Sequence, residues 1–246
     1  MALRSGRYHN VRHQKDAADR KRAAVWAKLA VQIASAVQLG GSGRPEDNPR
    51  LRLAIARARA AEMSSEAIER AIRKGLGQGG EGARALCELT YEGYAAGGVA
   101  VVVDAVTDNR NRTAPEIKKL FEVHGGALGT PGCVAWQFRT RACCLVAEAS
   151  EERVLEALLA ARAEVEDLLC HAGGVEVIAE PQHYDALVRA LTAADLQVRE
   201  ADIVRMPECT VPLADQATAH SVQALLVALD EHPDVQAVYH NAELSV

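Results

Sequence analysis

The first eighty residues have an apolar pattern with the period of an α-helix. Apolar residues recur every four positions between residues 17 and 39, and the glycine pair that follows is a helix stop. Asn48, which precedes a proline, predicts the N-cap of a second helix that runs to about Glu62. Ser64 begins a third predicted helix that ends at Gly75. The pattern therefore predicts a three-helix unit with basic outer faces, followed by a glycine-rich hinge.

After residue 82 the apolar period shortens to that of β-strands. Residues 86–94 and 98–107 are predicted to form two strands joined by a glycine-bearing turn, and residues 114–124 a helix. Farther along, strands are predicted near 133–138, 143–147, 165–170, 175–179, 197–204 and 235–241, and helices at 151–162, 182–193 and 217–231.

The order of these elements predicts how they group into domains. From residue 143 to 204 they run strand, helix, strand, strand, helix, strand, which is the split βαβ order of a ferredoxin-like domain. The final helix and strand supply what the region before residue 138 needs for a similar layer of helices on a sheet. We therefore expect an α+β multidomain protein with an all-helical N-terminal domain at 1–80 followed by two ferredoxin-like α+β domains. One is a discontinuous middle domain at 81–140 plus 207–246, and the other, at 141–206, is inserted into it.

The composition favours a protein that has several small cores and does not span a membrane. The 246 residues are 49% hydrophobic and only 4% aromatic. No run of 18 uncharged apolar residues occurs, and the first residues lack an apolar segment of signal-peptide length. We therefore expect a cytoplasmic protein, or one from an organelle interior if a presequence was removed. The six cysteines lack the spacing of a zinc site and are expected to be reduced thiols.

Charge is unevenly distributed along the chain. Residues 1–80 hold 16 Lys and Arg against 7 Asp and Glu, a balance of +9, which leaves 12 against 26, or −14, for residues 81–246. A polyanion would be attracted to the N-terminal part and repelled by the remainder, unless the remainder presents a local basic feature. The only tight basic cluster there is DNRNR, residues 108–112.

The segment TDNRNRT, residues 107–113, joins a predicted buried strand to a predicted helix. Thr113 and Glu116 have the spacing of a capping box, which predicts a helix start at Thr113. Free backbone N–H groups at such a start favour an anion, and arginine side chains add forked donors that match phosphate oxygens. Asparagines in the segment can bond base edges, ribose or the turn's own backbone. A purely structural turn with exposed arginines is the alternative. The candidate nucleic-acid contacts are Asn109, Arg110, Asn111 and Arg112.

The basic N-terminal arm is the second candidate interface. Between residues 4 and 28 there are eight basic residues against two acidic ones, with a tyrosine and two histidines interleaved. Such charges follow a phosphate backbone, and an aromatic ring can stack on an unpaired base. A solvated run of charges is the alternative interpretation. The candidate contacts in the arm are Arg4, Arg7, Tyr8, Arg12, His13, Lys15, Arg20, Lys21 and Arg22.

No arrangement of residues in the sequence predicts catalysis. His9 and His13 have i, i+4 spacing, but no third metal ligand is visible and the segment between them lacks the glutamate of a zinc-peptidase motif. The segment GGSGRPEDN lacks the Gly-Lys-Ser/Thr ending of a phosphate-binding loop. We therefore expect no enzyme activity, no metal, no cofactor and no small-molecule substrate.

Six segments together resemble, in order and spacing, the YebC/TACO1 family. They are NPRLR at 48–52, YEGY at 91–94, GG at 97–98, DNRNRT at 108–113, GGALGTPGCVA at 125–135 and DVQAVYHN at 234–241. The resemblance covers nearly the whole chain, and the N-terminal segment is similar to the opening of the family. The sequence departs from the family's usual pattern at three places: Tyr8 replaces a tryptophan, Ala95-Ala96 replaces Gly-Pro, and Ala127 replaces an asparagine.

The resemblance implies a helical N-terminal domain followed by two α+β domains, with no enzyme activity and no obligatory cofactor. Bacterial members are described as DNA-binding transcriptional regulators and mitochondrial members as translational activators. Members have also been linked to the ribosome and to relief of stalling at proline-rich sequences. The candidate contacts that the resemblance carries to this chain are the basic arm and residues 108–113.

Three functions are compatible with these features. We favour a translation factor that docks on the ribosome and contacts rRNA or tRNA, because an arm and a loop can hold an irregular RNA surface at two points. The alternative is a DNA-binding regulator with Arg50 and Arg57 of the second predicted helix in the major groove. The third is a module whose basic domain meets an acidic protein. For the favoured function, replacing both Arg110 and Arg112 by alanine is predicted to weaken RNA binding while changing thermal stability little.

Overall fold

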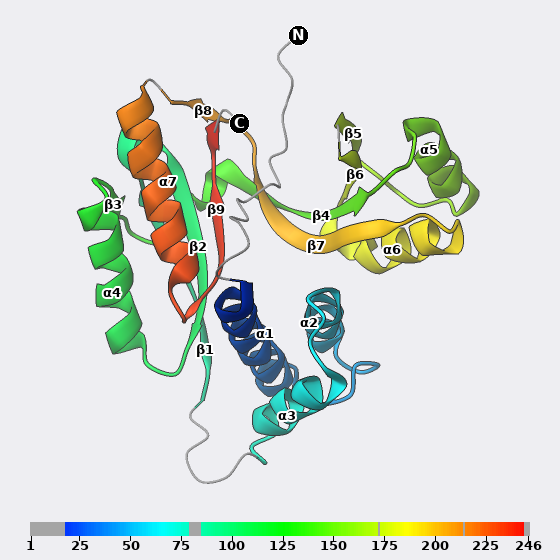
Figure 1. Cartoon of the computed structure of the whole chain (residues 1–246), viewed down its shortest axis with the longest axis horizontal. Coiled ribbons are helices and arrows are strands. Elements are labelled where there is room, and N and C mark those ends of the chain that lie inside the picture. Colours follow the sequence, from blue (N-terminus) through cyan, green and yellow to red (C-terminus); the bar gives the residue numbers. More distant parts are fainter. Residues whose placement is uncertain (1–17, 79–84, 172, 214, 244–246) are drawn as a thin grey trace. The chain divides into compact units, whose positions relative to one another are not determined.

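The computed structural model describes residues 18–78, 85–171, 173–213 and 215–243, and it is an α+β protein, as the apolar pattern predicts (Figure 1). One compact unit comprises Phe138–Met206. The other comprises the described residues before Phe138 and after Met206.

The N-terminal part of the larger unit is a three-helix domain. Its helices are α1 (Ala18–Gly40), α2 (Pro49–Ala60) and α3 (Ser65–Gly75). Asn48 caps α2 as predicted: its Oδ1 accepts from the Leu51 amide at 3.1 Å, and its Nδ2 donates to the Ala36 carbonyl at 2.8 Å. Gly75 lies inside α3 and does more than end it, because a Cβ there would lie 2.7 Å from Cβ of Val37. Glycine at this position therefore allows α3 to pack closely against α1.

The first helix has an apolar side that faces the helical core. By length and composition alone, Arg22–Gly40 could cross a membrane. Leu29, Ile33 and Val37 are instead buried in one cluster with apolar residues of α2 and α3. A core helix meets the same length and composition test, and this packing accounts for the apolar run.

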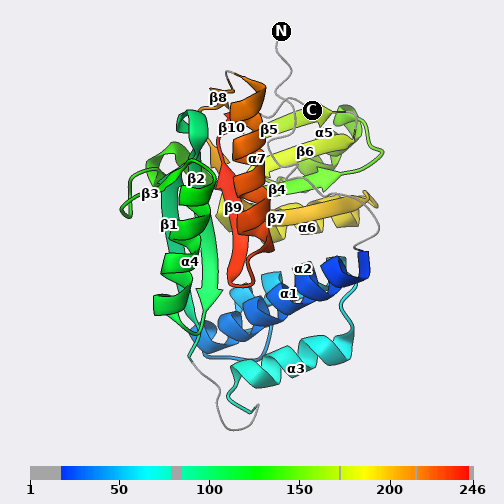
Figure 2. The ribbon, with the colours of Figure 1, turned by 60° about the vertical axis from the view of Figure 1, so that its left-hand side comes forward.

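A four-stranded antiparallel sheet forms the centre of the larger unit. Its strands are β1 (Cys87–Tyr94), β2 (Ala100–Thr107), β3 (Ala127–Leu128) and β9 (Val235–His240), in the order β3-β1-β2-β9. Helices α4 (Arg110–Val123) and α7 (Gln216–Glu231) lie side by side on one face of the sheet (Figure 2). Between them and the sheet, Phe121 and Leu225 are buried with Val101 and Val103. The short strands β8 (Val211–Pro212) and β10 (Ala242–Glu243) pair in parallel.

Two glycines shape the turn between β1 and β2. The Ala95 amide donates to the Val99 carbonyl at 2.8 Å, and a 3₁₀ turn, η2 (Ala96–Gly98), fills the space between them. Gly97 and Gly98 both have positive φ, 72° and 75°, which glycine adopts without the steric cost that other residues incur. The two glycines therefore supply the geometry of the turn.

The smaller unit has the ferredoxin-like topology that the element order predicts. It contains β4 (Phe138–Val146), α5 (Glu151–Ala160), β5 (Asp167–His171), β6 (Gly174–Ala179), a 3₁₀ turn, η4 (Pro181–His183), α6 (Tyr184–Ala193) and β7 (Val198–Pro207). Its sheet order is β5-β6-β4-β7, with β6 antiparallel to both neighbours. Leu158 of α5 and Leu187 of α6 are buried against this sheet.

The strands predicted at 133–138 and 143–147 are wrong as separate elements: a 3₁₀ turn, η3 (Ala135–Gln137), leads into the single strand β4. The polar residues 139–141 belong to β4 and lie before its pairing with β6, which begins at Ala142. Residues 79–82, half of the predicted hinge at 75–82, lie outside the described residues.

Candidate nucleic-acid interface

The segment 107–113 forms a tight connection between β2 and α4. Asn109, and not Thr113, is the N-cap: its Oδ1 accepts from the Arg112 amide at 3.3 Å, and α4 begins at Arg110. The predicted capping box is therefore wrong. Thr113 lies fully buried in the first turns of the helix, and its hydroxyl is 2.9 Å from Oγ1 of Thr107 and 2.6 Å from Oδ2 of Asp234.

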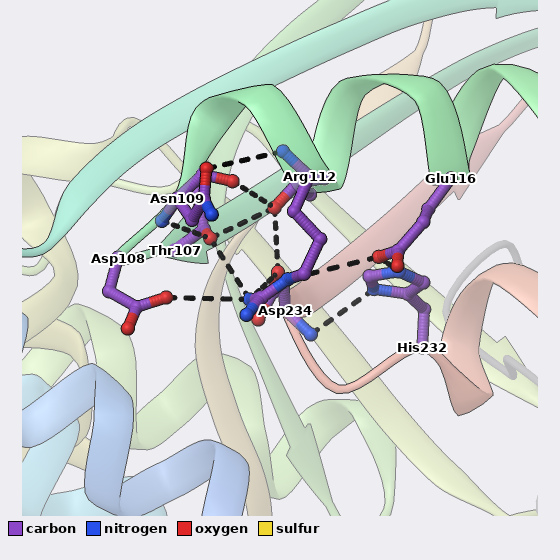
Figure 3. A network of polar contacts seen from close by, with 8 residues as sticks. Thr107, Asp108, Asn109, Arg112, Glu116, His232 and Asp234 are labelled. Carbon is purple, nitrogen blue, oxygen red and sulfur yellow. Dashed lines mark hydrogen bonds and ion pairs between the residues drawn. The ribbon is translucent and has the colours of Figure 1, made fainter.

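Glu116, the other half of the predicted box, takes part in a different contact (Figure 3). Its Oε2 lies 3.1 Å from Nε2 of His232, whose Nδ1 accepts from the backbone amide of Asp234 at 3.2 Å. Because Nδ1 is an acceptor in this arrangement, a neutral ring carries its proton on Nε2 and donates it to Glu116. Glu116 thus connects α4 to the turn between α7 and β9.

The guanidinium group of Arg112 is surrounded by carboxylates of the same chain (Figure 3). Its Nη2 lies 2.7 Å from Oδ2 of Asp234 and 3.5 Å from Oδ1 of Asp108, and its Nε lies 4.0 Å from Oε2 of Glu116. The hydrogen bond to Asp234 and the charge of that carboxylate raise the pKa of Arg112. The prediction of a forked donor open to phosphate therefore needs correction for Arg112, which holds its own loop together.

Asp234 is the anchor of this network. Burial works to raise the pKa of its carboxyl group, but hydrogen bonds from Thr113, Arg112 and Thr107 and the Arg112 charge outweigh burial, so that the pKa is lowered. The side chain is 12% exposed, and its ionised form accepts several donors at once. The start of α4 is therefore fixed by a single carboxylate from the opposite end of the sequence.

Arg110 and Asn111 project from the same turn without such partners. Both are exposed, and neither side chain has a hydrogen bond or ion pair to any described residue. The positive charge of Arg110 acts on Tyr91, whose pKa is raised by burial and lowered to a smaller extent by that charge. In the predicted loop, Arg110 is accordingly the cation available to an external phosphate, and the side-chain oxygen of Asn109 is committed to the backbone.

Most of the predicted basic arm lies outside the described residues, namely Arg4, Arg7, Tyr8, Arg12, His13 and Lys15. Arg20 and Lys21 lie in the first turn of α1, but their side chains are not among those described. Arg22 is exposed and has no partner among the described residues.

Three exposed cations on α3 were not among the sequence-based candidates. Arg70, Arg73 and Lys74 have i, i+3 and i+4 spacing and therefore share one face of the helix. None has a hydrogen bond or ion pair to another described residue. The signal that could have identified them is the amphipathic pattern of α3, in which Ile68 and Ala71 are buried and the basic residues fall on the other side.

Other cations of the helical domain are engaged within the larger unit. Lys28 donates to the backbone carbonyl of Asp230 and lies 3.6 Å from its carboxylate, and burial lowers the pKa of Lys28 despite that charge. Arg50 of α2 lies 3.0 Å from Oε2 of Glu88 in β1, and Arg57 lies 3.5 Å from Oε1 of Gln32. The arginine flank that a DNA-reading α2 would use is therefore occupied at both positions.

The described residues contain no group of three or more His, Cys, Asp and Glu side chains that could hold a metal ion. The pair His9 and His13 lies outside that part of the chain.

Comparisons with known proteins agree along nearly the whole chain. A family model described as the TACO1/YebC N-terminal domain matches residues 6–78, and one described as the TACO1/YebC second and third domain matches residues 86–242. A "Probable transcriptional regulatory protein" of Carboxydothermus hydrogenoformans is 42% identical over 243 residues, covering 97% of each chain. A protein of the same name from Dictyoglomus thermophilum is 39% identical over 241 residues, which are 97% of this chain and 94% of the relative.

A solved structure is similar over the same extent. The crystal structure of a conserved hypothetical protein from Aquifex aeolicus has a TM-score of 0.85 and 39% sequence identity, covering 97% of each chain.

Proposed function

Because the chain belongs to the TACO1/YebC family, we propose that it is a nucleic-acid-binding regulator of gene expression. In this proposal it is a ribosome-associated translation factor of the cytoplasm or of an organelle interior. It contacts rRNA or tRNA through the basic arm, the exposed face of α3 and Arg110 in the loop that begins α4. No catalytic step, metal or cofactor takes part.

The unpaired cations of α3 carry this proposal. Arg70, Arg73 and Lys74 lie on one exposed face of a domain whose sequence has a balance of +9 over residues 1–80. An arginine or lysine that has no internal carboxylate keeps its full interaction energy for an external phosphate, because no internal ion pair must be broken first. The acidic remainder of the chain, with a balance of −14 over residues 81–246, would repel the same polyanion. Binding is therefore directed to the helical domain.

The loop at the start of α4 has two kinds of residue in this proposal. Arg110 and Asn111 make contact, while Arg112 and Asn109 hold the turn in shape through Asp234 and the helix cap. A helix N-terminus with one free guanidinium group beside it can bind the oxygens of one phosphate group. The loop is thus a second, smaller contact point.

A DNA-binding transcriptional regulator is the second candidate, and the names of the relatives favour it. The geometry of α2 argues against this helix as the reading element, because Arg50 and Arg57 already bond to Glu88 and Gln32. Major-groove recognition needs side chains that are available for base edges.

Sedimentation and a matched pair of variants test the proposal. In cell extract on a sucrose gradient, we expect the protein to travel with ribosomal particles at low salt and to leave them as salt rises. Arg70→Ala with Arg73→Ala should weaken binding to a purified tRNA or rRNA fragment and reduce the salt slope of log K by about 2. Arg153→Ala with Arg189→Ala removes the same charge from exposed helix positions in the smaller unit and serves as the control.

Two results would decide against the translation factor. An unchanged salt slope in the α3 variant would show that this face does not meet phosphate. Absence from ribosomal particles at low salt, together with sequence-selective binding to duplex DNA, would support the transcriptional regulator instead.

A further inference from the structure

Two exposed aromatic side chains meet at one backbone carbonyl in the larger unit. Tyr94, at the end of β1, is 39% exposed, and Trp136, in the 3₁₀ turn η3, is 71% exposed. The Tyr94 hydroxyl donates to the carbonyl of Cys133 at 3.2 Å, and Nε1 of Trp136 donates to the same oxygen at 3.1 Å. One acceptor therefore anchors both rings, and we call these two side chains the aromatic pair.

The loop that carries this acceptor is held by a buried carboxylate. Glu92 is 7% exposed, and its side chain accepts from the amides of Gly132, Val134 and Ala135 at 2.7, 2.9 and 2.7 Å. Three donors satisfy an ionised carboxylate in a position where an unpaired one would be very costly. The loop is thereby fixed on β1, and the Cys133 carbonyl is fixed with it.

A second set of contacts fixes the pair from the other side. Nε2 of Gln137 lies 3.5 Å from the Tyr94 hydroxyl, and its Oε1 accepts from Nδ2 of Asn241 at 3.0 Å. Asn241 is 1% exposed and accepts in turn from the Ala100 amide at 2.8 Å. The aromatic pair is therefore oriented before any ligand arrives, which reduces the entropy lost on binding.

The two segments that carry the pair contain no charged side chain. Residues 93–103 and 125–138, which supply the strand end, the turn and the loop, contain no Asp, Glu, Lys, Arg or His. In a region whose balance is −14, this is a segment where a nucleic-acid strand meets no exposed carboxylate of the loop itself. Of the acids near these segments, Glu92 is buried and hydrogen-bonded. Glu208 is exposed beside the loop, and its backbone amide donates to the Gln137 carbonyl at 2.8 Å.

We propose that the aromatic pair Tyr94 and Trp136 is a stacking site for an unpaired nucleobase of single-stranded RNA. Stacking on an aromatic face is the sequence-tolerant contact that single-strand binders use. The polar edges of both rings are consumed by the Cys133 carbonyl, so that the ring faces are what a ligand meets. A proline-rich peptide in polyproline II conformation offers backbone carbonyls that seek such edge donors, and this geometry has none left to give. The site rests on the proposed RNA-binding function and adds to it a contact with an unpaired base.

Trp136→Leu tests the site directly. With a single-stranded oligoadenylate of about 12 nucleotides as probe, the affinity should fall about 5- to 100-fold, the effect of losing one stacked base. Trp136→Phe keeps a ring and should retain most of the affinity. The salt slope should stay unchanged in both variants, because stacking displaces no counterions. Val123→Ala, at a side chain that is 66% exposed at the end of α4, is the matched control.

Intrinsic fluorescence supplies a readout that a purely structural role would not change. The chain has two tryptophans, and the oligoadenylate should quench the wild type much more than Trp136→Leu, in which only Trp26 remains. An RNA duplex of the same length should bind without this difference, because its bases are already stacked.

The possible failures can be told apart. If the oligoadenylate binds but Trp136→Leu changes neither affinity nor quenching, the stacking site is overturned while the RNA-binding function stands. If a proline-rich peptide, and not the RNA, alters Trp136 fluorescence, the occupant is a peptide and the proposal is wrong. If no RNA binds the wild-type chain at all, the stacking site and the proposed function both fall.

Discussion

Asp234→Asn isolates the charge that holds the start of α4. The substitution keeps the size of the side chain, and its amide oxygen can still accept from Thr113. It removes the negative charge that Arg112 approaches at 2.7 Å. Because the Asp234 side chain is only 12% exposed, the change should affect the folded state and have little counterpart in the unfolded chain.

The contacts of Asp234 determine how much stability the substitution removes. Hydrogen bonds to a charged group contribute about 1.5–3 kcal/mol when buried. The lower part of this range applies, since the Arg112 side chain is 44% exposed and partly screened by solvent. We expect the free energy of unfolding to fall by about 1–2 kcal/mol, which lowers the melting temperature by about 2–8 °C for a unit of this size.

The lowered pKa of Asp234 also predicts how the stability difference between wild type and Asp234→Asn changes with pH. The pKa of Asp234 is lowered in the folded state, so its ionised form stabilises the fold at every pH above its ordinary value of about 3.9. That contribution is lost as pH falls through the lowered pKa. The gap between wild type and Asp234→Asn should therefore be constant from about pH 5 to 8, begin to narrow below about pH 4, and close only as the pH falls through the lowered pKa.

Thermal melting followed by circular dichroism, repeated across this pH range, measures the gap. Asp47→Asn is the matched control, because its partner Arg44 lies 3.7 Å away and their side chains are 60% and 78% exposed; such a pair contributes little. A variant Asp234→Asn that melts with the wild type at pH 7, or a gap that does not narrow at all as the pH is lowered below 4, would refute the role given to this carboxylate.

Two further predictions concern other buried groups. Asn48→Ala removes three hydrogen bonds from a residue that is 2% exposed. The free energy of unfolding in urea should fall by about 2–4 kcal/mol, against about 1 kcal/mol for Ser64→Ala at an exposed cap. Equal costs would contradict the role of Asn48 as a link between α1 and α2. In a pulse of iodoacetamide at pH 8, exposed Cys209 should be labelled first, and buried Cys143 and Cys144 only after unfolding. Burial raises the pKa of both buried thiols, that of Cys144 to about 12. Rapid labelling of Cys144 in the native state, detected in peptide mass spectra, would count against this packing.

The sequence predicted those parts of the fold that depend on neighbours along the chain. The caps Asn48 and Ser64, the helical stripes and the order of elements in the ferredoxin-like unit are local patterns, and they agree with the structure. Helix starts are decided within one turn, and apolar periods within two or three, so that a short window contains the whole signal.

The start of α4 shows where such a window fails. Asn109 and Thr113 are both good caps by their residue type, and the spacing of Glu116 favoured Thr113. The choice was settled by Asp234, a residue 121 positions away from Thr113, which takes the Thr113 hydroxyl. The same carboxylate engages Arg112, so the stability of an Arg110→Ala, Arg112→Ala double variant should fall, contrary to the expectation from the sequence, and Arg110→Ala alone is the cleaner test of binding.

The aromatic pair was missed for a related reason. Tyr94 and Trp136 are 42 positions apart in the sequence. They come together because Glu92 holds the loop that carries Trp136 on β1. An acidic residue inside a strand pattern gives no sign of which amides it will meet.

The arrangement of the central sheet determines when the chain can finish folding. Helix α7 and strand β9, which follow the inserted unit, supply Leu225, Leu229 and Val235 to the core that covers Val101 and Val103 of β2. A chain that ends before these last elements lacks part of the apolar cover of Val101 and Val103, and Ile117 and Phe121 of α4 remain to contribute to it. Apolar surface exposed in this way makes an unfinished chain prone to aggregation.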